Sequence, residues 1–420
     1  MFTRTLSLST ISRTVQLNVV LMLTAFLFIS FSTSLPVQAS SMSHWVGAWG
    51  AAPAFENSED FFRGTIRQNV QLSIGGDRVR IKIDNSLGKN SLEIGAATIA
   101  LPGSRPGEIT TSSLKKITFS GSHSIILKAG DSALSDPIVF HVNPLSEVQI
   151  SLFIPRAVGL ITTHPLARDT SYISSNNDQT TLASMSDIYT THQRYFISRI
   201  DVDNSHASSL VVLGDSITDG KNSTSGKNSR WPDFLAKRLI KSGYNYGIVN
   251  SGIAGNRILH DLPVHQFGPS AISRLDRDVI SVPNLSKVIF LEGINDIGLP
   301  KFLGLNDQDV TAEEIISGIK KIISKVHENN VKIYGSTLTP FYGAKFPGYF
   351  SKKAEEKRIK INHWIRTSRS FDGVIDFDLA IRDSLHPERI KEDFDSGDHL
   401  HPNDKGYKEM AYSIPLELFN

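Results

Sequence analysis

The sequence contains no cysteine among its 420 residues. This absence excludes disulfide bonds, thiolate metal sites, cysteine catalysis and lipid attachment to an N-terminal cysteine. The fold must therefore be held together by its apolar core, for which 40% hydrophobic residues provide ample material. The composition is otherwise ordinary for a globular protein, and the length allows two or three domains.

An excess of charge of either sign is also missing. The full chain carries 44 Lys and Arg residues against 42 Asp and Glu residues. Residues 1–39 contain Arg4 and Arg13 and no acid, so the remainder of the chain has no net charge. A neutral chain gives no support for binding to nucleic acid or to an anionic membrane surface, and neither partner is expected.

Residues 1–39 have the pattern of a signal peptide. Arg4 and Arg13 precede an apolar run over 19–31, and small residues lead to a cleavage site at Ala39. The alternative is a membrane anchor, but polar residues end the run too early for a span of about 20 residues. We therefore predict cleavage after Ala39, no membrane span once the signal is removed, and a secreted or periplasmic location.

Residues 44–200 alternate between apolar and polar positions, which is typical of strands with one buried face. Two such runs, 66–74 and 79–83, flank Gly75-Gly76 and predict a β-hairpin. Turn residues separate further strand candidates at 116–119, 124–127, 137–142 and 147–154. The pattern predicts an all-β sandwich domain over 44–200, followed by a polar linker over 201–208.

Residues 209–420 show a different pattern, in which short apolar runs alternate with helical periodicity. The apolar runs predict buried strands at 210–213, 247–250, 287–291, 331–334 and 374–377. Helices are predicted at 231–241, after the capping-box sequence that begins at Thr311, at 351–367 and at 406–414. Alternating strands and helices predict an α/β domain with a mostly parallel sheet covered on both faces.

Four polar blocks in this second part carry the candidate chemistry: Gly214-Asp215-Ser216, the loop 251–257, Glu292-Gly293-Ile294-Asn295-Asp296, and Asp398-His399-Leu400-His401-Pro402-Asn403. Ser216 follows a buried strand and is a candidate nucleophile, which needs a base to accept its proton. His401 can be that base, and Asp398 can orient it. An oxyanion requires donors, for which the backbone N–H groups of Ser216 and Gly255 and the Asn295 amide are candidates.

Each block taken alone has an ordinary structural explanation as a turn or loop. Asp215 and Arg257 are further candidates for substrate binding. Asp215 is expected to order the nucleophile loop rather than react, and a surface or salt-bridge role is an alternative for Arg257. His399 and His401 with Asp398 have a spacing found in metal sites, but no further ligand cluster is evident, so we predict no metal and no cofactor.

Together the blocks resemble the SGNH hydrolases, also called the GDSL esterase/lipase superfamily, over about 205–415. The resemblance rests on Gly-Asp-Ser-Ile-Thr, Gly-Ile-Ala-Gly-Asn, Gly-Ile-Asn-Asp and Asp-x-x-His, in type, order and spacing. It implies a three-layer α/β/α, flavodoxin-like fold. It also implies that the four signature residues are Ser216, Gly255, Asn295 and His401, and that Asp398 completes a catalytic triad.

Further motifs are similar to the secreted bacterial, xylan-esterase-like branch of that superfamily. They include Phe346-Pro347-Gly348-Tyr349 and Asp395-Ser396-Gly397-Asp398, with Trp45 and Trp49 near the start of an N-terminal β domain. The resemblance implies a serine esterase that removes short, acetyl-like acyl groups, from carbohydrate or another ester. The alternatives are an acyltransferase to a sugar acceptor, a lipase or lysophospholipase-type esterase, and a non-enzymatic carbohydrate-binding protein. An intact set of triad residues argues against the last.

Overall fold

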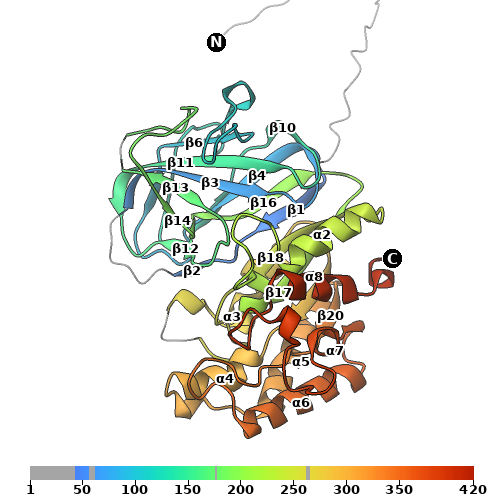
Figure 1. The fold of residues 1–420 in the computed structure, drawn as a ribbon. Helices are drawn as coiled ribbons and strands as arrows, with labels where there is room; N and C mark the ends of the chain where they lie inside the picture. The colour runs from blue at the N-terminus through green and yellow to red at the C-terminus, as the bar shows by residue number, and fades with distance from the viewer. Residues whose placement is uncertain (1–42, 56–61, 176, 262–264) are drawn as a thin grey trace, which may run out of the picture. The chain divides into compact units, whose positions relative to one another are not determined.

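The computed structural model describes residues 43–55, 62–175, 177–261 and 265–420, so the predicted signal peptide lies outside the described residues. Within these ranges no helix is long and apolar enough to cross a membrane. Residues 43–420 form one compact unit. We call the part that contains strands β1 to β16 the β region, and the part from β17 onward the α/β region (Figure 1).

The β region consists of two larger antiparallel sheets with one core between them. One sheet has the order β1-β16-β4-β10, with β9 paired to β4, and the other has the order β14-β13-β3-β11-β6-β7. Alternate side chains of both sheets, such as Ile66 of β3 and Ile81 of β4, belong to the same apolar cluster. The predicted all-β sandwich is therefore confirmed. Its strands are β1 (Trp45–Gly50), β2 (Ala54–Phe55), β3 (Phe62–Gln71), β4 (Gly76–Asp84), β5 (Leu92–Ile94), β6 (Ala96–Ala100), β7 (Lys115–Lys116), β8 (Ile125–Leu127), β9 (Ser132–Leu134), β10 (Ile138–Val142), β11 (Glu147–Val158), β12 (Thr162–His164), β13 (Ser171–Ser174), β14 (Ile188–Thr191), β15 (Arg194–Tyr195) and β16 (Ile197–Asp203).

The predicted hairpin around Gly75-Gly76 is wrong. The two strands exist, but β3 pairs with β11 and β13, whereas β4 pairs with β16, β10 and β9 in the opposite sheet. The connection crosses between sheets at a point of close backbone approach. A Cβ at Gly75 would lie 2.4 Å from the Val142 carbonyl oxygen, and a Cβ at Gly76 would lie 2.6 Å from that of Asp203. The glycine pair therefore reflects crowding between strands and not a hairpin turn.

The α/β region is built on one parallel sheet with the order β18-β17-β19-β20-β21. This is the flavodoxin-like order 2-1-3-4-5, as the resemblance implied. Its strands are β17 (Ser208–Gly214), β18 (Tyr246–Gly252), β19 (Leu285–Leu291), β20 (Lys332–Ser336) and β21 (Gly373–Ile375). Its helices are α1 (Ser216–Asp219), α2 (Trp231–Lys241), α3 (Ala271–Leu275), α4 (Ile294–Phe302), α5 (Ala312–Glu328), α6 (Lys352–Thr367), α7 (Phe377–Ile381) and α8 (Asp404–Ser413). Short 3₁₀ segments lie at Thr111–Ser113, His265–Phe267, Asn306–Gln308, Glu392–Phe394 and Leu416–Phe419, and a π-helical turn at Asp276–Ile280 follows α3.

Both faces of this sheet are covered, which explains the continuous apolar run of β17. Val211 and Leu213 pack into a cluster with α5 and α6, whereas Leu210 and Val212 pack into a second cluster with α2 and α8. A strand buried on both faces needs apolar residues at successive positions. The three-layer α/β/α fold is confirmed. Four helices were not predicted from the sequence: α4, which contains Pro300, and the short helices α1, α3 and α7.

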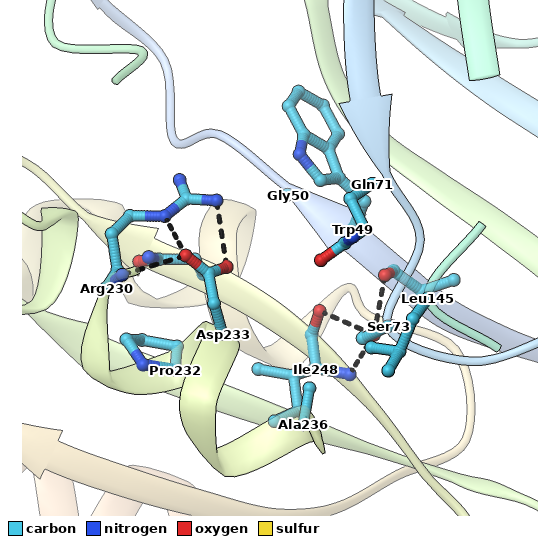
Figure 2. Close-up of a pocket in the computed structure, with 12 residues that line it drawn as sticks. Trp49, Gly50, Gln71, Ser73, Leu145, Arg230, Pro232, Asp233, Ala236 and Ile248 are labelled. Carbon is cyan, nitrogen blue, oxygen red and sulfur yellow. Dashed lines mark hydrogen bonds and ion pairs between the residues drawn. The ribbon is translucent and has the colours of Figure 1, made fainter. Parts of the chain in front are cut away.

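The two regions contact each other through β1 and the turn after β3. The Gly47 N–H donates to the Ser209 hydroxyl at 2.9 Å. The Ile248 N–H donates to the Ser73 hydroxyl at 2.7 Å (Figure 2). The residues expected as a polar linker, 201–208, include the end of β16 and the first residue of β17. Asp201, one of the polar residues of this stretch, is buried and accepts hydrogen bonds from Arg80 and Arg199.

Candidate active site

Ser216 is the first residue of α1, and only Asp215 separates it from the end of β17 at Gly214. A Cβ at Gly214 would lie 2.5 Å from the Leu291 carbonyl oxygen of β19, so only glycine fits at the strand end. Asp215 is the N-cap of α1, and its Oδ1 accepts a hydrogen bond of 2.9 Å from the Ile217 N–H. This turn presents Ser216 at the carboxyl edge of the parallel sheet, where open α/β sheets bind their ligands.

His401 and Asp398 lie beside Ser216, on the loop before α8. The Ser216 Oγ is 2.9 Å from His401 Nε2, and His401 Nδ1 is 2.7 Å from Asp398 Oδ2. Asp398 Oδ1 also accepts the backbone N–H groups of Leu400 and His401, at 3.0 and 2.8 Å. Because the carboxylate accepts the Nδ1 proton, Nε2 is the ring atom left to accept the proton of the Ser216 hydroxyl.

Asp398 is held in its ionised form by its surroundings. Burial alone raises the pKa of this carboxyl, but the hydrogen bond and charge of His401 and the two backbone N–H groups lower it by more. The pKa of Asp398 therefore lies well below its usual range. Asn222 adds a further donor, since its Nδ2 is 2.8 Å from Asp398 Oδ2 and 2.9 Å from the Ser396 hydroxyl. Sequence reasoning missed Asn222, whose only signal was its position six residues after Ser216.

The side chain of Asn295, at the start of α4, has a fixed orientation. Its Nδ2 donates to the Asn256 carbonyl oxygen at 2.9 Å, and its Oδ1 accepts the Tyr349 hydroxyl at 2.7 Å. An Nδ2 group has two hydrogens, so one remains for the cavity in front of Ser216. Tyr349 was not predicted as a site residue, because in the sequence it stands out only as part of the motif Phe346-Pro347-Gly348-Tyr349.

Gly255 lies on the loop after β18 with a φ of +78°, a left-handed conformation that favours glycine. A Cβ there would also lie 2.3 Å from the Phe267 ring. The small size of this residue therefore permits both the loop conformation and the close approach of the Phe267 ring to its backbone.

Ser216, His401, Gly255 and Asn295 line one cavity of about 160 Å³. The rest of its lining is largely apolar and consists of Lys221, Ala254, Phe267, Leu299, Phe302, Phe346, Tyr349 and Leu400. An apolar cavity of about 150 Å³ is large enough for a benzene ring. The structure therefore brings the predicted nucleophile, base and oxyanion donors together beside a space for an apolar group.

Two residues expected to bind substrate do not line this cavity. Asp215 is buried beneath the turn, and burial raises its pKa to about 7. Arg257 is also buried, and its guanidinium donates to the side chain and backbone oxygens of Gln308 at 2.7 and 3.1 Å. Asp215 thus has the ordering role that the sequence favoured for it, since it caps the nucleophile turn. Arg257 has the alternative salt-bridge role: its Nε lies 3.8 Å from Asp296 Oδ1, and its contacts with Gln308 join the loop after β18 to residues that precede α5.

The side chains of His399 and His401 point toward different partners, which gives no support to the hypothesis that they bind one metal ion. His401 faces Ser216, whereas His399 Nδ1 bonds to the Asp395 carboxylate. The backbone of His399 is left-handed, with a φ of +61°.

Residues 212–409 match the model of the GDSL-like Lipase/Acylhydrolase family. The α/β region is a GDSL-type hydrolase domain. The protein is therefore a hydrolase, and the SGNH resemblance of the four blocks is confirmed at the level of this domain. Assignment to the xylan-esterase-like branch stays a prediction.

Solved structures that resemble the hydrolase domain cover about half of this chain. A carbohydrate acetylesterase from Sinorhizobium meliloti is 19% identical, with 50% of this chain and 98% of that chain covered and a TM-score of 0.40. An aryl esterase from M. smegmatis is 16% identical, with 50% of this chain and 98% of that chain covered and a TM-score of 0.41. A lipase/acylhydrolase from Enterococcus faecalis is 20% identical, with 50% of this chain and 95% of that chain covered and a TM-score of 0.39. No curated protein matches the sequence. At this level of similarity the named substrates remain properties of those proteins.

Proposed function

We propose that the protein is a serine esterase that works through an acyl-enzyme. The observation that carries the proposal is the continuous series of contacts from Ser216 Oγ through His401 to Asp398, at 2.9 and 2.7 Å, beside an open cavity. A serine hydroxyl becomes nucleophilic when a base accepts its proton in the transition state.

In the first half of the reaction, Ser216 Oγ forms a bond to the ester carbonyl carbon while its proton moves to His401 Nε2. The carbonyl oxygen becomes an oxyanion, for which the N–H groups of Ser216 and Gly255 and the free Nδ2 hydrogen of Asn295 are the proposed donors. The bond to the alcohol oxygen then breaks, and His401 returns the proton to the departing alcohol.

In the second half, water replaces the alcohol. His401 accepts a proton from the water, the water oxygen attacks the acyl carbon, and the bond to Ser216 Oγ breaks with return of the proton to the serine. The Asp398 carboxylate stabilises the imidazolium in both halves. If a sugar hydroxyl takes the place of water, the same residues perform acyl transfer, so this alternative is decided by the acceptor.

The lining of the cavity supports an apolar acyl group larger than acetyl, although the sequence favoured an acetyl-like group on a carbohydrate. A lining dominated by Leu299, Phe302 and Phe346 stabilises a buried hydrocarbon or aromatic group. An acetyl group would leave most of about 160 Å³ unfilled. A carbohydrate then remains the proposed alcohol part, outside the cavity, and a lipase-type substrate is the alternative.

The test is a series of p-nitrophenyl esters with acetyl, butyryl and octanoyl groups, assayed with and without an added sugar acceptor. We expect hydrolysis of all three, with kcat/KM several-fold higher for butyryl than for acetyl, because each buried methylene contributes about 0.8 kcal/mol. Turnover that requires the sugar would favour the acyltransferase. If none of the three esters were hydrolysed, the proposed esterase function would be contradicted and a binding protein would be favoured.

We also propose that the chain is exported to the periplasm or the cell exterior and processed after Ala39. The support is the basic, apolar and small-residue pattern of residues 1–39. The mass of the protein isolated from its native host is the test: a mass that corresponds to a start at Ser40 is expected, and one that includes Met1 would contradict processing.

A further inference from the structure

His164 is a buried side chain of the β region with both ring nitrogens hydrogen bonded. Its Nδ1 is 2.9 Å from the Ala52 carbonyl oxygen, and its Nε2 is 2.9 Å from Asp219 Oδ1 of α1. A carbonyl oxygen and a carboxylate are both acceptors, so each ring nitrogen must carry a hydrogen. The geometry therefore fits an imidazolium paired with a buried carboxylate across the boundary between the two regions.

Asp219 carries this contact to the loop that holds Gly255. It is the last residue of the helix that begins at Ser216, and its Oδ2 accepts the Ala254 N–H at 3.1 Å. Ala254 directly precedes Gly255, and both line the cavity. One carboxylate thus bonds to His164 with one oxygen and to the loop of the proposed oxyanion donor with the other.

A second contact from the β region reaches the same loop. Ala52 and Ala54 form a small apolar cluster with Ile253, the residue before Ala254. Ala52 is also the residue whose carbonyl oxygen bonds to His164. The β region therefore holds the loop at two successive positions, once by apolar packing and once through Asp219.

The other charged groups around His164 have partners of their own. Arg230 pairs with Asp233 at 2.8 Å, and Arg194 pairs with Asp169 at 3.1 Å. Burial lowers the pKa of His164 and Arg230 lowers it further, but the Asp219 charge and the two hydrogen bonds raise it by more, so the net shift is upward.

The space that His164, Arg194, Asp219 and Arg230 line has a volume of about 10 Å³, which is at most about one water molecule. This position therefore has no room for a substrate, and His164 can act on the reaction only through the residues that it holds.

We propose that His164 is a positioning residue of the hydrolase site: it fixes Asp219, which holds the Ala254 N–H and thereby the position of the neighbouring Gly255 N–H. The inference rests on the proposed esterase function, because that function assigns the Gly255 N–H to an oxyanion. It makes the β region part of the machinery that stabilises the transition state, although no side chain of that region is assigned to the chemistry itself.

The test compares His164→Ala and His164→Gln with the wild type on p-nitrophenyl butyrate. Loss of one oxyanion donor costs about 100-fold or more in kcat, so a displaced donor should cost about 10-fold. KM should change little, because the oxyanion exists only in the transition state. The glutamine amide can still donate to Asp219, so His164→Gln should recover most of kcat.

Ser73→Ala is the matched control. It removes another buried contact between the two regions, in which the Ser73 hydroxyl accepts the Ile248 N–H (Figure 2). The partners of this hydroxyl are the backbone groups of Ala48 and Ile248 rather than Asp219. Thermal unfolding should show a similar loss of stability, while kcat should stay at the wild-type value. If His164→Ala does not fold, Asp219→Asn replaces it, with the same expected fall in kcat.

The outcomes separate the two proposals. A wild-type protein that hydrolyses no ester would overturn the esterase and this inference together. An active wild type whose folded His164 or Asp219 variants keep their kcat, or lose only what Ser73→Ala loses, would overturn the positioning role alone. A change confined to KM would likewise contradict it.

Discussion

The two regions of the molecule bury their apolar residues in different ways. The β region encloses one core between two antiparallel sheets, whereas the α/β region covers both faces of one parallel sheet. Parallel strands end at a common edge, and Ser216, Gly255 and Asn295 follow β17, β18 and β19 there. The described strands of the β region pair antiparallel and share no such edge, and the region reaches the site through contacts with Asp219 and Ile253. In our proposals the α/β region carries out the chemistry and the β region positions one of its loops.

The most severe test of this assignment is Asp398→Asn, a change confined to the α/β region. The amide can donate to His401 Nδ1, which would place the ring proton on Nε2, where it cannot accept the Ser216 proton. We expect kcat to fall by about 10⁴-fold with little change in folding. Steady-state kinetics and thermal unfolding check this. Activity within 10-fold of the wild type would remove Asp398 from the triad.

Asn295→Ala should have the next largest effect. It deletes the proposed side-chain donor to the oxyanion, and kcat should fall by about 100-fold or more. Tyr349→Phe is the companion variant, because it removes only the hydroxyl that orients the Asn295 amide. Tyr349→Phe should lower kcat by a smaller factor than Asn295→Ala does. If Asn295→Ala keeps its kcat, Asn295 does not belong to the oxyanion hole.

Deleting residues 1–207 tests the β region as a whole. The remaining fragment keeps Ser216, Asp398 and His401, and its cores are separate from that of the sandwich. We expect hydrolysis of small esters at about one tenth of the full-length kcat, as for His164→Ala, and a larger loss on bulky substrates. Solubility should fall because Val249 and Ile253 lose their cover. If the fragment hydrolysed both small and bulky esters at the same rates as the full chain, the proposed role of the β region would be contradicted.

The smallest expected effect concerns buried carboxyls and pH. In the β region Asp201 pairs with Arg80 and Arg199 at 2.8 and 2.7 Å, whereas Glu292, behind the site, lies 3.7 Å from Arg274. Burial raises the pKa of Glu292 to about 8 from a usual value of 4.5. The unfolded chain then binds fewer protons than the folded one between these values, so stability should fall as pH rises from about 4.5 to about 8.

Glu292→Gln should remove the part of the pH dependence of the free energy of unfolding that Glu292 causes. Denaturant unfolding of both proteins between pH 4 and about 9 would measure it, with a free energy of unfolding that depends less on pH in the variant. Parallel curves for the two proteins would mean that the pKa of Glu292 is not raised in the folded state.

The buried strands and the main residues of the candidate site could be predicted from the sequence, because each depends on a short local pattern. The strands of the α/β region follow from apolar runs such as 287–291, and Ser216, Asp398 and His401 stand in short motifs at strand or helix ends. The pairing of β3 and β4 could not be predicted, because alternation defines a strand's buried face and not its partner. Asn222, Tyr349 and His164 were missed because their roles arise from contacts with residues 54 to 176 positions away.

The central claim, that Ser216 carries the acyl group, is tested most directly by mass spectrometry of the protein quenched during turnover of p-nitrophenyl butyrate. We predict one added butyryl group, located by digestion on the peptide that contains Ser216, and no such adduct or turnover in a folded Ser216→Ala variant. An adduct on another residue, or hydrolysis by Ser216→Ala at a rate close to that of the wild type, would contradict the account.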